Sequence, residues 1–324
     1  MMWTNTKTLC LPDVITGPDQ DFAASVIEGL SLPRKSLPCR FFYDARGSEL
    51  FEEITQLQDY YPTRTEIAIL EGHAAEIAGG AVEKAVLVEF GSGSSRKTEI
   101  LLNNLPGLAA YVPVDVSESA LSDAKQRLLK RFPELAVRLI IGDFSRRLAF
   151  PEDLVSAEKL GFFPGSTIGN FSPPDATALL RAMRELLSPD GRLIIGVDLK
   201  KDAHALVQAY NDADGVTAAF NLNLLARINR ELEGSFDLAC FRHEAIYDPR
   251  EGRVEMHLVS CKDQAASVRD RWFRFYAGET IHTENSYKYT IGQVQELARA
   301  AGWLPSRVWT DAGNLFSVHE LIFG

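Results

Sequence analysis

The segment Leu87–Ser95, with the sequence LVEFGSGSS, constrains the fold of this chain more than any other segment. An apolar run interrupted by Glu89 breaks into Gly91-Ser-Gly93, and a helical pattern begins at Lys97. A buried strand that passes through a glycine turn into a helix commonly seats a nucleotide-like cofactor. Arg96 stands where a dinucleotide site would have its third glycine, so a cofactor without a pyrophosphate is favoured. A tight turn that binds no ligand is the alternative.

Two acidic residues follow the next two expected strands. Asp115 lies 22 residues after Gly93, where a carboxylate typically accepts hydrogen bonds from ribose hydroxyls. Gly142-Asp143-Phe144 ends the third strand and could hold an adenine amine and ring. A helix cap at Asp115 and a plain turn after the third strand are the alternatives. Together the three strand ends indicate one cofactor site, and S-adenosylmethionine (SAM) is the leading candidate.

Strand and helix patterns alternate from Val86 onward, which predicts an α/β fold with a doubly wound, parallel sheet. Apolar runs predict strands over Val86–Phe90, Tyr111–Val116, Leu135–Ile141, Phe162–Ile168 and Arg192–Leu199. Periodic patterns predict helices over Lys97–Leu105, Ser117–Arg131 and Asp175–Leu187.

The alternation breaks after Leu199. Two helices are expected within Asp202–Glu233, and strands over Phe236–Tyr247, Arg253–Ser260 and Phe273–Tyr276. A helix over Ile291–Ala301 and strands over Leu304–Trp309 and Leu315–Ile322 would complete the core sheet. We therefore expect a SAM-binding core of residues 61–200 and 287–324. Residues 1–60 and 201–286 would form an inserted α+β substrate-binding or lid domain, with the binding cleft between the two.

Composition narrows the class of protein. The 324 residues carry a net charge of −10, which argues against a nucleic-acid partner. No apolar run reaches the roughly 18 residues of a membrane span, and the first residues do not resemble a signal peptide, so a cytoplasmic protein is expected. The four cysteines form no CxxC pair, so neither a metal site nor a disulfide framework is expected. No interface with a partner chain is readable, and a monomer is expected.

Two further segments are dense in residues that could bind a ligand. Tyr43–Glu66 reads YDARGSELFEEITQLQDYYPTRTE, and Pro164–Asp175 reads PGSTIGNFSPPD. The second lies at the end of the expected fourth strand, where methyltransferases commonly hold the methyl acceptor. The first could instead be a helical arm with a solvated face, and the second a turn capped by an asparagine.

With these segments included, the chain resembles the SAM-dependent histidine Nα-methyltransferases of ergothioneine biosynthesis over nearly its whole length. Besides Tyr43–Glu66, the motifs that carry the resemblance are VEFGSGSS-x-KT, VDVS, GDF, GSTIGN, DLKKD, VEMHL and ENS. YYPTR and GSTIGN in this order are highly specific, whereas the glycine turn alone is not.

The resemblance implies a class I methyltransferase core and three methyl transfers from SAM to the α-amine of L-histidine. The products would be trimethylhistidine (hercynine) and S-adenosylhomocysteine. It implies catalytic roles for Tyr43 and Asn170. It implies cofactor contacts from Tyr43, Gly91, Lys97, Asp115, Asp143 and Phe144. It implies substrate contacts from Tyr60, Gly165, Asn170, Tyr210, Met256, Glu284 and Ser286, with the last two at the imidazole.

The residue types suit this chemistry. Methyl transfer from a sulfonium is an in-line displacement in which the acceptor amine needs a free lone pair. A neutral pocket containing Tyr43 and Asn170 suits such an amine better than a carboxylate, which would favour the ammonium form. Other acceptors, such as tryptophan, tyrosine or a histidine-derived amine, stay open, as does a SAM-binding sensor without activity. Without the resemblance, Tyr210 could be a surface aromatic residue and Met256 ordinary core.

Overall fold

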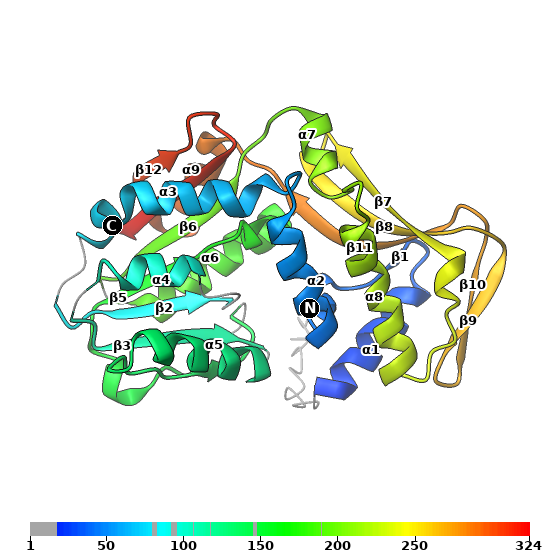
Figure 1. Ribbon diagram of the computed structural model, residues 1–324, viewed down its shortest axis with the longest axis horizontal. Coiled ribbons are helices and arrows are strands. Elements are labelled where there is room, and N and C mark those ends of the chain that lie inside the picture. The colour runs from blue at the N-terminus through cyan, green and yellow to red at the C-terminus, as the bar shows by residue number, and fades with distance from the viewer. Residues whose placement is uncertain are drawn as a thin grey trace, which may run out of the picture.

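The computed structural model describes residues 18–79, 83–91, 96–105, 107–116, 118–144, 148–188 and 190–324. A seven-stranded sheet with helices forms the left of the molecule in Figure 1, and a smaller α+β part forms the right. A four-stranded sheet underlies the smaller part, and a two-stranded ribbon extends from it (Figure 1).

The large sheet has the strand order β12-β13-β6-β5-β2-β3-β4. The strands from β6 to β4 are parallel, and β13 runs antiparallel to its two neighbours. Their bounds are β2 Val86–Phe90, β3 Ala110–Asp115, β4 Ile140–Ile141, β5 Lys159–Phe163, β6 Arg192–Asp198, β12 Trp303–Thr310 and β13 Phe316–Phe323. After β2 the chain first builds one side of the sheet and then, from β5, the other. Ligands of such sheets bind at the carboxyl ends of the strands near this reversal.

Helices cover both faces of the large sheet, which confirms the doubly wound α/β class. Val86, Val88 and Phe90 of β2 share a core with apolar side chains of α6 and α9, and Leu87 shares another with those of α3 and α4. This alternation follows from the two-residue period of a strand. The bounds are α3 Tyr61–Ala78, α4 Arg96–Leu102, α5 Glu118–Arg131, α6 Pro173–Leu187 and α9 Ile291–Ala300.

The smaller sheet has the order β1-β11-β8-β7. Its strands are β1 Lys35–Ser36, β7 Phe241–Asp248, β8 Arg253–Ser260 and β11 Thr280–Tyr287, and the ribbon is β9 Gln264–Val268 with β10 Arg271–Phe275. Its helices are α1 Pro18–Ser31, α2 Ala45–Gln56, α7 Ala203–Gln208 and α8 Val216–Glu231. Because β1 pairs with β11, residues near the start of the described chain share a sheet with residues far along it. The exact domain limits stay a prediction.

Some element bounds differ from the expectation. The third strand is only β4, with an isolated bridge between Tyr111 and Val137 in place of the rest. The fourth ends at Phe163, because Pro164 follows and Gly165 and Ser166 adopt φ angles of 82° and 57°. Strands β9 and β11 were not expected; β11 has polar residues on both faces and a register shift after His282.

Gly196 in β6 leaves space for a carboxylate from α3. A Cβ atom at Gly196 would lie 2.0 Å from Oε1 of Glu66, whose side chain is buried. That carboxylate accepts hydrogen bonds from the backbone N–H of Gly165 at 2.9 and 3.1 Å, so it cannot move freely.

Gly196→Ala should therefore destabilise the protein by about 1–3 kcal/mol, the usual range for overpacking a core. Denaturant unfolding measures the change. Gly72→Ala is the matched control, because Gly72 lies exposed within α3 with nothing within 4 Å of an added Cβ. That control should gain roughly 0.5–1 kcal/mol from the better helix former. Equal unfolding free energies for Gly196→Ala and the parent would contradict the packing argument.

Candidate functional site

The predicted cofactor residues lie at one edge of the large sheet. Gly91 follows β2 with φ of 77°, and its N–H donates to the carbonyl oxygen of Val114 at 2.9 Å. The N–H of Gly142 donates to the carbonyl oxygen of Asp115 at 2.9 Å, which aligns the end of β4 with that of β3. Asp143 follows directly. The residues that follow the parallel strands thus lie at one edge of the sheet, as expected. Ser92–Ser95 of the glycine turn lie outside the described residues.

Phe144 closes this edge with an aromatic ring. The ring packs against Phe90 and Phe163 with centroid distances of 6.1 and 5.7 Å. Its Cε1 would lie 3.9 Å from a Cβ atom built on Gly91. An aromatic surface beside a backbone without a side chain suits a flat heterocycle such as adenine.

Glu89 connects the strand before the glycine turn to the helix after it. Its buried carboxylate accepts hydrogen bonds from the hydroxyl of Thr98, at 2.7 Å, and from that of Tyr111. Burial raises the pKa of Glu89 to about 7, although these hydrogen bonds oppose the shift. Since Thr98 belongs to α4, the acid fastens the helix after the turn to the strand before it.

Lys97 binds another carboxylate, that of Glu66. The Lys97 ammonium lies 2.5 Å from Glu66, which also holds the Gly165 N–H. The structure therefore places Lys97 in an ion pair between α4 and α3, and a cofactor contact from it stays a prediction. Sequence reasoning missed Glu66, although it is the acid that ends the YYPTRTE motif.

The predicted substrate residues converge around β11. Glu284 stands opposite Met256 of β8 in the sheet register. The hydroxyls of Tyr210 and Ser286 are 2.7 Å apart, and the Tyr60 ring lies 6.2 Å from that of Tyr210. Met256, Tyr60 and Tyr210 belong to one hydrophobic core. These residues come from four separate elements of the chain, so only the fold brings them together.

Asn170 approaches β11 from the large sheet. It ends a short 3-10 helix, η3 Thr167–Asn170, that packs tightly against the strand. A Cβ atom on Gly169 would lie 2.8 Å from the carbonyl oxygen of Tyr287 and 3.5 Å from Oγ of Ser286. Gly165, at the start of this loop, is exposed and needs its positive φ.

Four polar groups at this place have no hydrogen bond to any described residue: the Tyr43 and Tyr60 hydroxyls, the Asn170 amide and the Glu284 carboxylate. Burial raises the pKa of Glu284 to about 7, and the Lys288 ammonium opposes this shift. Burial also raises the pKa values of Tyr43 and Tyr60 well above their usual range, and Glu284 adds to both shifts. Tyr43 is exposed, and Asn170 and Glu284 are only partly buried, so their polar groups are accessible to a ligand.

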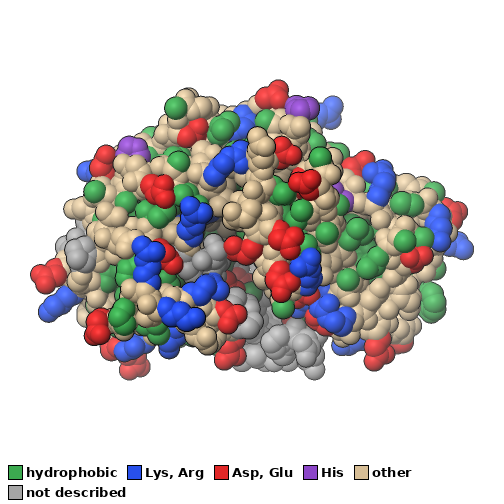
Figure 2. All heavy atoms as spheres, viewed as in Figure 1, with side chains coloured by type: hydrophobic (Ala, Val, Ile, Leu, Met, Phe, Trp, Pro, Cys, Tyr) green, Lys and Arg blue, Asp and Glu red, His purple; other side chains and the backbone are tan. Residues whose placement is uncertain are grey.

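Tyr43 shows that the site is open to solvent. Its side chain is 42% exposed, although its ring contacts those of Phe51 and Phe220 at 5.6 and 5.8 Å. The face in Figure 2 is hollowed between the two parts, with acidic side chains beside the hollow.

A buried carboxylate, Asp198, joins the two parts behind the site. It ends β6 and accepts hydrogen bonds from the Tyr61 hydroxyl at 2.8 Å. It forms ion pairs with Lys201 at 2.5 Å and with Lys288 at 2.7 Å. Ser166 Oγ accepts the Asp198 N–H at 2.9 Å. Sequence reasoning missed this group, although DLKKD contains Asp198 and Lys201.

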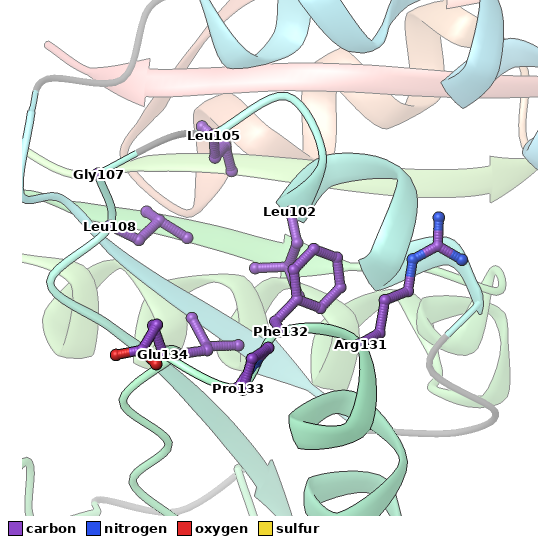
Figure 3. A pocket seen from close by; sticks show the side chains of 9 residues that line it. Leu102, Leu105, Gly107, Leu108, Arg131, Phe132, Pro133 and Glu134 are labelled. Carbon is purple, nitrogen blue, oxygen red and sulfur yellow. The ribbon is translucent and has the colours of Figure 1, made fainter.

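Another hollow, of about 460 Å³, lies at the amino ends of the strands (Figure 3). It is lined mainly by apolar side chains of the end of α4 and of the loops before β3 and β4, including those of Leu102, Leu108, Phe132 and Leu135. Since Gly91 and Asp115 lie at the carboxyl ends, this hollow is separate from the candidate site. Among the described residues, no group of His, Cys, Asp or Glu side chains could hold a metal ion. The same residues include no helix long and apolar enough to cross a membrane.

The raised pKa of Glu284 predicts a pH-dependent cost to stability. Between the ordinary value of 4.5 and about 7, the folded chain binds more protons at this group than the unfolded chain. The unfolding free energy contributed by Glu284 therefore falls as pH rises through this window. The unfolding free energy of Glu284→Gln minus that of the parent should therefore increase by roughly 1–3 kcal/mol from about pH 5 to about pH 8.

Urea unfolding of parent and variant at both pH values measures this gain. Glu296→Gln, which removes a carboxylate from the exposed side of α9, is the control and should follow the parent. A stability difference between Glu284→Gln and the parent that is the same at both pH values would contradict the assignment.

Comparisons with known proteins identify the family of the chain. Residues 22–322 match the model of a family described as histidine-specific, SAM-dependent methyltransferases. The chain is 42% identical to a histidine N-alpha-methyltransferase of Mycobacterium tuberculosis, with 90% of this chain and 92% of that protein covered. It is 40% identical to the enzyme of the same name from Mycolicibacterium smegmatis, with 90% and 91% covered.

One more distant relative is named for another acceptor. A 4-dimethylallyltryptophan N-methyltransferase of Aspergillus fumigatus is 28% identical, with 94% of this chain and 95% of that protein covered. A solved structure, magnesium protoporphyrin IX methyltransferase of Synechocystis, gives a TM-score of 0.48 at 12% identity, covering 88% of this chain and 98% of the other. The family match and the two mycobacterial relatives decide the assignment. The chain belongs to the histidine-specific, SAM-dependent methyltransferase family.

Proposed function

We propose that this protein transfers methyl groups from SAM to the α-amine of L-histidine, three times, and so forms hercynine in ergothioneine biosynthesis. The observation that supports histidine as the methyl acceptor is the Glu284 carboxylate. It has no hydrogen bond to a described residue and lies beside Ser286 and Met256. The family and the two mycobacterial relatives support the same reaction.

The residues at the edge of the large sheet fit SAM. Gly91 leaves the backbone approachable, Phe144 offers a ring surface for adenine, and Asp115 ends the strand where a ribose would lie. We assign Asp143 to the adenine amine and Tyr43 to the methionine end, with Lys97 nearby. When bound, SAM supplies a methyl group on a sulfonium, and S-adenosylhomocysteine is released.

The chain's own residues position the acceptor amine. Asn170 and Tyr43 have polar groups with no described partner, and we assign both to the amine. Tyr60, Gly165 and Tyr210 would hold the rest of the amino-acid backbone. Neither Tyr43 nor Asn170 is charged, and the Glu284 carboxylate on β11 is assigned to the imidazole, so no acid is assigned to the amine itself. Holding an amine with a free lone pair in line with a methyl group can lower the barrier by roughly 7–11 kcal/mol.

Glu284 would select histidine by accepting a ring N–H. A side chain without such a donor would leave this carboxylate buried and unpaired, at a cost of about 1–3 kcal/mol. Met256 would pack against the ring from the neighbouring strand.

The cellular setting follows from the same proposal. An enzyme whose two substrates are small soluble metabolites needs neither a nucleic acid nor a membrane as a partner. We propose that the protein is a cytoplasmic monomer. Size-exclusion chromatography with light scattering would report the oligomeric state.

The assay that decides the function supplies the purified protein with SAM and each common amino acid in turn. We expect robust methylation of histidine alone, and mass spectrometry should identify the trimethylated product. Methylation of tryptophan or tyrosine with histidine inert would replace the assignment by the alternative acceptor class. No methylation of any amino acid would favour a SAM-binding protein without this activity.

Glu284→Ala should raise the KM for histidine roughly 10–100-fold, because the ring loses its acceptor. The kcat should change less, since the ring is remote from the transferred methyl group. Glu244→Ala removes a carboxylate from β7 of the same sheet, where it pairs with Arg242 at the surface, and should keep the parent's KM. An unchanged KM in Glu284→Ala would count against the imidazole contact.

A further inference from the structure

Lys288 is buried directly behind the histidine pocket. Its side chain has 0% exposure and its ammonium has three partners. Asp198 Oδ2 lies at 2.7 Å, Ser286 Oγ at 2.7 Å and the Tyr210 hydroxyl at 2.9 Å. An ammonium has three N–H donors and no acceptor, so these partners use all of them. Lys288 therefore occupies one lone pair on each of the two hydroxyl oxygens.

This arrangement restricts the hydrogen bond between the two hydroxyls. They are 2.7 Å apart, and one must donate to the other. Each oxygen has one proton and two lone pairs. In the hydroxyl that accepts, one lone pair is used by Lys288 and the other by the neighbouring hydroxyl. This hydroxyl can therefore only donate to a third group. The other hydroxyl uses its proton in the hydrogen bond between the two and can only accept from a third group.

The chemistry of the two groups sets the direction. A phenol is a stronger donor and a weaker acceptor than an aliphatic hydroxyl, so Tyr210 donates to Ser286. The Ser286 proton is then directed to a third group. Ser286 and Glu284 lie two residues apart on β11, so their side chains share a face of the sheet. The pocket thus presents one O–H donor beside one carboxylate acceptor.

We propose that Lys288 is a positioning residue that fixes Ser286 as a hydrogen-bond donor, so that the pocket selects the neutral imidazole of histidine over imidazolium. The proposal rests on the proposed function. Neutral imidazole offers one lone pair and one N–H, which match Ser286 and Glu284. Imidazolium offers two N–H groups and no lone pair, so one of them would face the Ser286 proton.

Other titratable groups surround this cluster from several elements. They are Tyr60, Tyr61, Asp198, Lys201, His243 and Glu284. The Nε2 atom of His243 contacts only the backbone oxygen of Tyr210, at 2.8 Å. Lys201 contacts Asp198 and the Tyr61 hydroxyl but neither Ser286 nor Tyr210. Among the described residues, Lys288 is thus the cation that acts on the hydroxyl pair.

The test measures binding of histidine and of 2-fluorohistidine, whose ring stays neutral at these pH values. Calorimetry in the presence of S-adenosylhomocysteine prevents turnover. The ratio of the two affinities cancels the titration of the enzyme itself, including that of Glu284. In the parent, the affinity for histidine divided by that for the analogue should fall about tenfold from about pH 8 to about pH 5.5, in proportion to the neutral fraction of histidine.

Lys288→Met should reduce this relative loss to about twofold or less, because the Ser286 hydroxyl can then turn and accept an N–H. Lys201→Met is the matched control: it removes the other buried cation from Asp198 and should keep the parent's tenfold loss. An effect of Lys288 on folding alone would alter both affinities together and leave their ratio unchanged.

Each outcome has one meaning. A Lys288→Met variant with the parent's pH dependence would overturn the proposal. So would a parent that binds histidine and the analogue with the same ratio at both pH values, a result that needs no variant to fold. If histidine binds at pH 8 in these experiments, the proposed function stands even where the role of Lys288 fails. If histidine binds at neither pH, the proposed function fails, and the role of Lys288 fails with it.

Discussion

The buried carboxylate of Asp198 holds together the two parts of the molecule. It lies at the end of β6 with a side-chain exposure of 1%, and its partners come from other elements. Tyr61 begins α3, Lys201 precedes α7 and Lys288 follows β11. A buried charge is costly unless it is paired and hydrogen-bonded, and removing one partner of such a pair is strongly destabilising. The position of β11 relative to the large sheet is therefore coupled to the neutralisation of Asp198.

The site is arranged as a neutral end and a charged end. Tyr43 and Asn170 present uncharged polar groups where the amine is proposed to bind, whereas Glu284 stands on the wall of the smaller sheet. Glu284 is partly buried and has no hydrogen bond to a described residue, whereas the fully buried Asp198 is paired with two cations and a hydroxyl. Under the proposed function, the imidazole ring of histidine supplies the hydrogen-bond donor for Glu284.

Sequence patterns could predict the core sheet because its information is local. Each strand from β2 to β6 is an apolar run with a turn at its carboxyl end. The location of Gly91, Asp115 and Asp143 at one edge of the sheet could therefore be predicted from their positions after these runs. Strand β11 mixes polar residues on both faces, and nothing local marks it as a strand. Its Glu284 and Ser286 were identified only through the resemblance. Asp198 and Lys288 are 90 residues apart, and no periodicity reports that such residues meet.

The cofactor side and the acceptor side share a second buried carboxylate, that of Glu66. It binds Lys97 at the start of α4, just after the cofactor turn, and the N–H of Gly165, at the start of the loop that ends in Asn170. Neither loop can shift without disturbing this carboxylate, which fits against β6 only because Gly196 has no side chain. A misplacement of about 1 Å can cost an in-line transfer roughly a hundredfold in rate. Under the proposed function, the Glu66 carboxylate therefore links the segment beside the methyl donor to the loop beside the acceptor, with the fixed geometry of charge-assisted hydrogen bonds.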